Sequence, residues 1–134
     1  MNYSQRLIDH FRNPRNAGMM RDPDGVGEGN FDGCGDLARF SLKVVDGRVS
    51  DVRFQTYGCG PTIAASSAGS ELAIGRPVSE LLALSEQQVT AAVDGLPDER
   101  LHAAQVVAGA IRAAARDYLA RRNTQNRSEV RPHV

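Results

Sequence analysis

Hydrophobic and polar residues alternate between residues 38 and 44, with the period of a strand that buries one face on a core. An Asp46-Gly47 pair follows, which is a strong signal for a hairpin turn. Most of the return run, residues 49–56, keeps the alternation, but Val49 is out of phase, so we expect a bulge near Ser50-Asp51. The pattern predicts two antiparallel strands joined by a tight turn.

Helical spacing of apolar residues marks several other segments. Residues 3–12 predict a short helix that ends at Asn13-Pro14. Small residues from 62 to 68 suit a helix packed closely on a sheet, and the capping box of residues 85–88 opens another helix. The last helix begins after Asp98, and its apolar stripe consists of Leu101, Ala104, Ala108, Ile111, Ala115 and Tyr118.

Two stretches show no regular pattern. Residues 13–36 are rich in turn-forming residues, glycine above all, and predict a long irregular segment of a kind that is often functional or mobile. Residues 123–134 are polar and predict a disordered C-terminal tail. Because no internal repeat or second core is evident, we expect a single domain over residues 1–122.

The composition excludes several classes of partner. The chain has 134 residues, of which 41% are hydrophobic and 24% charged, as in an ordinary globular domain. Its 16 basic and 16 acidic residues cancel, so no overall field attracts nucleic acid or an anionic membrane. No apolar run resembles a signal peptide or is long enough to cross a bilayer, and we therefore expect a cytoplasmic protein. In a reducing cytosol, two cysteines favour metal or thiol chemistry over a disulfide.

The two cysteines occupy similar places in the predicted hairpin. Cys34 lies in Gly33-Cys34-Gly35-Asp36, just before the first strand, and Cys59 lies between two glycines just after the second. In an antiparallel hairpin these positions share one end of the sheet, so we expect the two thiols to be neighbours. Asp36 and His102, in the first turn of the last helix, add carboxylate and imidazole. Zinc and iron accept all of these ligand types.

Each residue also has a simpler interpretation. A histidine in a first helical turn is more often a polar surface residue than a ligand, and an aspartate before a strand is usually a turn residue. A single cysteine can be a small buried hydrophobe. We expect His10, which has Arg6 and Asp9 nearby, to be a surface residue.

Four segments together resemble the IscU/NifU-type iron–sulfur cluster assembly scaffolds. They are YSQRLIDHFRNPRNAG at 3–18, GCGD at 33–36, VSDVRFQTYGCG at 49–60 with AASS at 64–67, and LPDERLH at 96–102 followed by AIRAA at 110–114. The resemblance, which covers residues 3–121, implies an α+β domain with a small three-stranded antiparallel sheet and helices packed on it. In that family three cysteines, assisted by an aspartate, build the cluster; Cys34, Asp36 and Cys59 match three of these positions, and His102 matches the histidine before the third cysteine. These four residues supply two soft and two harder ligands, so we expect them to hold a transient [2Fe–2S] cluster or iron, or Zn²⁺ in its absence.

The chain departs from the resembled family at two places. The family's third cysteine is replaced by Ala103, which we expect to face the same end of the sheet as Cys34 and Cys59. The resemblance implies a cysteine desulfurase and acceptor apo-proteins as partners. In the family the desulfurase delivers sulfur to the third thiol, and Ala103 has no sulfur atom to accept it. The segment Leu96-Pro97-Asp98-Glu99-Arg100 lacks the family's chaperone motif, so we do not expect recognition by an Hsp70-type chaperone.

Three functions are compatible with these residues. The first is a non-enzymatic scaffold or carrier for iron–sulfur cluster assembly. The alternative is a degenerate zinc-binding relative that regulates or docks on assembly partners without building clusters. A cysteine-dependent enzyme, with Cys59 as nucleophile and His102 as base, is disfavoured because the sequence shows no histidine–carboxylate pair to orient the base.

Overall fold

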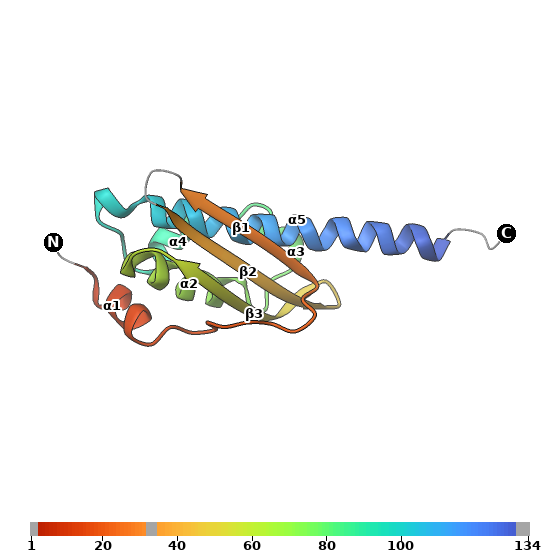
Figure 1. Ribbon diagram of the computed structural model, residues 1–134, viewed down its shortest axis with the longest axis horizontal. Helices are drawn as coiled ribbons and strands as arrows, with labels where there is room; N and C mark the ends of the chain where they lie inside the picture. Colours follow the sequence, from red (N-terminus) through yellow and green to blue (C-terminus); the bar gives the residue numbers. More distant parts are fainter. Residues whose placement is uncertain (1–2, 32–34, 131–134) are drawn as a thin grey trace.

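The computed structural model describes residues 3–31 and 35–130, and for residues 125–130 it describes the backbone alone (Figure 1). The elements in chain order are α1 (Gln5–Arg12), β1 (Gly25–Phe31), β2 (Asp36–Val45), β3 (Arg48–Tyr57), α2 (Gly60–Ala73), α3 (Val78–Leu81), α4 (Glu86–Ala92), a 3₁₀ helix (Asp98–Arg100) and α5 (His102–Val130). Strands and helices segregate along the chain, as expected of an α+β domain.

The three strands form one antiparallel sheet in the order β1-β2-β3, which confirms the expected fold class. Asp46 and Gly47 both have positive φ, 52° and 78°, as a tight two-residue hairpin turn requires. The expected bulge is present, because Lys43 pairs with Asp51 whereas Val44 pairs with Val49. The residue between these partners on β3 is the extra one.

Strand β1 corrects the expectation that residues 13–36 form one long irregular segment. A Cβ atom added at Gly27 would lie 2.1 Å from the backbone nitrogen of Ala114, and one at Gly29 would lie 2.1 Å from the carbonyl oxygen of Val106. Helix α5 therefore rests almost directly on the backbone of β1 (Figure 1). Because strands are poor in glycine, a strand built around this close approach looks like a loop in the sequence.

The apolar face of the sheet packs against α2 and α5. The alternating residues of β2 that were expected to face a core, such as Phe40 and Leu42, are completely buried. They belong to the same hydrophobic core as Val107 and Ile111 of α5, while α1 lies on α2 with Leu7 in a second cluster. This packing fixes the first turns of α2 and α5 at the end of the sheet where β3 finishes.

His10 is buried, contrary to the expectation of a surface residue. Its Nδ1 lies 2.7 Å from the hydroxyl oxygen of Ser67 on α2, and that oxygen also accepts a hydrogen bond from the backbone N–H of Arg15. Burial lowers the pKa of His10 below its ordinary value of 6.5, and the positive charge of Arg15 acts in the same direction. This network attaches α1 and the segment after it to α2.

Helix α5 continues to Val130, into the segment 123–134 that we expected to be disordered, and its last turns project beyond the rest of the molecule (Figure 1). The domain boundary at residue 122 stays a prediction. Within the described residues, no helix combines the length and apolarity needed to cross a membrane.

Candidate metal centre

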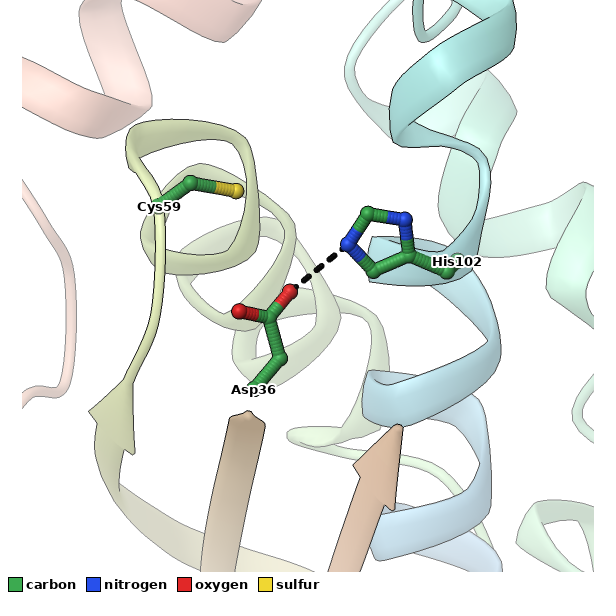
Figure 2. A group of neighbouring side chains, drawn as sticks. All are labelled: Asp36, Cys59 and His102. Atoms are coloured by element: carbon green, nitrogen blue, oxygen red, sulfur yellow. Dashed lines mark hydrogen bonds and ion pairs between the residues drawn. The ribbon is translucent and has the colours of Figure 1, made fainter. Parts of the chain in front are cut away.

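Three of the four predicted site residues meet at one end of the sheet. Asp36 is the first residue of β2, Cys59 is the N-cap of α2 just after β3, and His102 is the first residue of α5. One ligand atom from each of these residues lies within 4.8 Å of the others, and Figure 2 shows the three side chains converging. Cys34 lies outside the described residues. The carboxylate, thiol and imidazole are thus placed as a metal site needs them, although metal binding itself stays a prediction.

Gly58, just before Cys59, leaves room for the carboxylate of Asp36. A Cβ atom at Gly58 would lie 2.6 Å from Oδ1 of Asp36 and 3.3 Å from Cβ of Thr62. On the other side of the cysteine, a Cβ atom at Gly60 would lie 3.3 Å from the ring of Phe11. The two glycines therefore let the chain carrying Cys59 pass close to Asp36 and α1, which brings the sulfur into the site.

A buried hydrogen-bond network orders the carboxylate. Oδ2 of Asp36 accepts from Nε2 of His102 at 2.8 Å and from the hydroxyl of Thr62 at 2.9 Å. The same hydroxyl oxygen lies 3.3 Å from Sγ of Cys59. Asp36 is only 4% exposed, so these donors satisfy a carboxylate that water barely reaches.

Thr62 is a member of the site that the sequence pattern does not reveal. Residues 62–68 are small side chains that suit close helix packing, and Thr62 is completely buried. The available signal was its spacing, because a residue three positions after the N-cap Cys59 lies on the same side of α2 as the cysteine. A hydroxyl at that spacing can reach both the thiol and a carboxylate beneath it.

The imidazole of His102 is held from two sides. Nε2 donates to Asp36, and the ring of Phe31 stacks on it with the ring centroids 4.8 Å apart. A ring nitrogen that donates this proton cannot at the same moment offer a lone pair to a metal. Coordination through Nε2 would therefore replace the His102–Asp36 hydrogen bond with two metal–ligand bonds.

The donor set fits zinc or iron. Thiolate and imidazole match both metals, and the carboxylate adds a harder ligand. Three protein ligands among the described residues leave a tetrahedral position open for Cys34, sulfide or water. Cys59 is half-buried and lines a cavity of about 390 Å³ together with Tyr3, Phe11 and Arg12, so the thiol can be reached from outside.

Ala103 does not lie where the sequence led us to expect. It is the second residue of α5, beside His102, but it is fully buried and belongs to the main hydrophobic core. The helix that directs the His102 imidazole to the site thus buries the next side chain inside the protein. The position of the family's third thiol is here part of the packing.

The geometry also bears on a cysteine-dependent enzyme. The His102–Asp36 pair supplies the orienting carboxylate that the sequence did not reveal. However, the hydrogen bond of Cys59 within the described part of the chain goes to Thr62, and none joins its sulfur to His102. The direct nucleophile–base contact that defines such a site is therefore missing from this arrangement.

Comparison with known proteins identifies the class of protein to which this chain belongs. Residues 2–125 match the NifU-like N terminal domain, and the chain belongs to that family.

Among individual proteins, the chain is similar to the iron–sulfur cluster assembly scaffold protein IscU 1 of Archaeoglobus fulgidus, with 43% identity over 116 residues, covering 87% of this chain and 76% of the relative. It is 40% identical to the scaffold protein IscU of Azotobacter vinelandii over 122 residues, covering 88% and 94%. The structure of a putative scaffold protein for the SUF system of Fervidobacterium islandicum shares the fold, with a TM-score of 0.71 at 18% identity, covering 84% of this chain and 96% of that one.

Proposed function

We propose that this protein is an iron–sulfur cluster assembly scaffold, which holds iron, sulfide or a transient [2Fe–2S] cluster and passes it on. The observation that carries the proposal is the convergence of Asp36, Cys59 and His102 within 4.8 Å in a chain of the NifU-like family. Scaffold proteins named for this role are its relatives over most of its length. Nothing in the comparisons favours the zinc-binding alternative.

The ligand count supports a mixed-ligand cluster. A [2Fe–2S] cluster takes four terminal ligands, and Cys34, Asp36, Cys59 and His102 would supply one each. Histidine ligation of one iron in such a cluster is chemically precedented. Thiolates are the ligands that iron–sulfur clusters favour, so a cluster with carboxylate and imidazole in their place is held less firmly, which suits a cluster that must leave again.

The sulfur would arrive on one of the two remaining thiols. A cysteine desulfurase is the proposed donor, and Ala103 offers neither a sulfur atom nor exposure. Cys59 is the described thiol and is reachable from the cavity beside α1.

Acceptor apo-proteins are the proposed recipients. Docking of an Hsp70-type chaperone is not part of the proposal, because Asp98 and Glu99 place two acidic groups in the 3₁₀ helix before α5. The cytoplasmic location stays a prediction.

Anaerobic reconstitution tests the function. The protein is incubated with ferric iron, a thiol reductant and sulfide, desalted, and analysed for iron, zinc, acid-labile sulfide and visible charge-transfer absorption. We expect iron and sulfide in equal amounts with the absorption of a [2Fe–2S] cluster, and loss of both in Cys59→Ser. Asp36→Asn should give a reduced yield, whereas the matched control Asp51→Asn, a carboxylate away from the site that pairs with Arg53, should not. Zinc without sulfide, or a cluster unaffected by Cys59→Ser, would refute the scaffold proposal.

A further inference from the structure

We propose that Thr62 is a positioning residue of this site, whose hydroxyl holds the Asp36 carboxylate and the Cys59 sulfur in place for the metal. This inference rests on the proposed function, because it concerns the same ligands. Thr62 itself is not offered as a ligand. It acts through the two groups that its hydroxyl contacts.

The hydroxyl connects two ligands that come from different elements. It donates to Oδ2 of Asp36 at the start of β2, and its oxygen lies 3.3 Å from Sγ of Cys59 at the start of α2. Thr62 is 0% exposed, so water does not compete for these contacts. A buried hydroxyl with two such partners lowers the freedom of both side chains at once.

The importance of Thr62 rises when a metal binds. Without metal, Oδ2 of Asp36 has two donors, His102 and Thr62. If Nε2 of His102 offered its lone pair to a metal, its donation to Asp36 would end. Thr62 is then the side-chain donor that remains on this carboxylate among the described residues. Without the hydroxyl, a carboxylate that is 4% exposed would lose its orientation as well as its hydrogen bond.

The single proton of the hydroxyl also links the two ligands to each other. While that proton is donated to Asp36, the thiol of Cys59 can donate its own proton to the lone pair of the Thr62 oxygen. If a metal were bound, the sulfur would be a thiolate, which can only accept a hydrogen bond. The hydroxyl would then donate either to Asp36 or to the thiolate and would orient one of the two ligands in either case.

The simpler interpretation is that Thr62 only fills space in the first turn of α2. Valine has nearly the same shape as threonine without the hydroxyl, so Thr62→Val separates the two explanations. Thr62→Ser keeps the hydroxyl with one methyl group fewer. Ser66, one turn further along α2, provides a matched control, since its buried hydroxyl has no hydrogen-bond partner.

Cobalt(II) serves as the probe, because its visible spectrum reports both thiolate bonding and coordination geometry. Affinity is measured by competition with a chelator, and folding without metal is checked by thermal unfolding. Replacing an outer-shell partner of a metal ligand typically costs 10–100-fold in affinity. We expect a loss of about this size in Thr62→Val, with weaker or shifted thiolate-to-cobalt absorption. Thr62→Ser should stay within a few-fold of the parent and Ser66→Ala should match it.

The outcomes separate the two proposals. Parent-like cobalt affinity and spectrum in folded Thr62→Val would overturn the role of Thr62 while leaving the scaffold function intact. If Thr62→Val does not fold, Thr62→Ala removes the same hydroxyl without placing a methyl group against the carboxylate, and parent-like binding in it would be equally decisive. Equal cobalt binding by the parent and Cys59→Ser would show that the site itself is not formed by these residues, and both proposals would fail.

Discussion

Replacing Gly27 with alanine should destabilise the protein strongly, because α5 rests on the backbone of β1 at this point. The added Cβ would lie 2.1 Å from the nitrogen of Ala114 and 2.5 Å from the carbonyl oxygen of Ala110. Non-bonded atoms pack at about 3.5 Å, so strand and helix would have to separate by roughly 1 Å or more. Both obstructing atoms belong to the helix backbone and cannot rotate away.

The size of the effect follows from two opposing terms. Overpacking a core typically costs about 1–3 kcal/mol, and an obstruction by backbone belongs at the upper end of that range. Against this, alanine is favoured over glycine within a strand by roughly 0.5–1 kcal/mol. We therefore expect a net loss of about 2 kcal/mol in the free energy of unfolding, which lowers Tm by several degrees for a domain of this size.

Urea unfolding followed by far-ultraviolet circular dichroism measures this loss. The matched control is Gly109→Ala in α5, where the nearest atom to an added Cβ is the end of the Arg112 side chain at 4.0 Å, so the helix should gain up to about 1 kcal/mol. Since α5 carries His102, the cobalt affinity of Gly27→Ala should fall as well. A free energy of unfolding within about 0.5 kcal/mol of the parent would refute the close approach of β1 and α5.

Substitutions at Ala103, His10 and the site residues test the rest of the structure. A thiol introduced by Ala103→Cys should react with a thiol reagent far more slowly than Cys59 in the folded protein and at a similar rate after denaturation, because Ala103 is fully buried; fast reaction in the folded state would show that the start of α5 opens readily. The pKa of His10 is lowered in the folded protein, so the unfolded state binds more protons and the free energy of unfolding should decrease as the pH falls below about 6.5. His10→Gln should reduce this pH dependence, and equal pH profiles of parent and variant would contradict the burial of His10. His102→Ala should weaken zinc binding more than Asp36→Ala in a chelator competition, since imidazole is the better-matched ligand, and the reverse order would assign the main role to the carboxylate.

The sequence predicted the helices and strands whose side chains alternate between core and solvent. It did not predict elements that depend on close backbone contacts or on residues far away in the chain. The β2–β3 hairpin and its bulge followed from alternation and from Asp46-Gly47, because both signals are local. Strand β1 was missed because its inward positions are glycines that make room for a helix more than 70 residues later in the chain, as Gly29 and Val106 show. Such contacts leave no periodic trace in the sequence.

The sequence predicted the residues of the site better than the hydrogen bonds between them. Hairpin geometry and the family resemblance led to Asp36, Cys59 and His102, because each lies at the end of a recognisable element. The Thr62 hydroxyl was not found, because a threonine within a helix of small residues has no feature that distinguishes packing from hydrogen bonding. His10 was placed wrongly because its partner Ser67 lies 57 residues away.

The three described site residues can come together only late in the synthesis of the chain. The hydrogen bond between Asp36 and His102 spans 66 residues, and His102 begins the element that finishes the fold. While the ribosome is still producing α5, the sheet and Cys59 can already exist, but the imidazole has no helix to hold it. Until α5 docks on β1, only the carboxylate and the thiol of the three can be in place. A site that uses all three residues therefore requires the completed packing of α5 on the sheet.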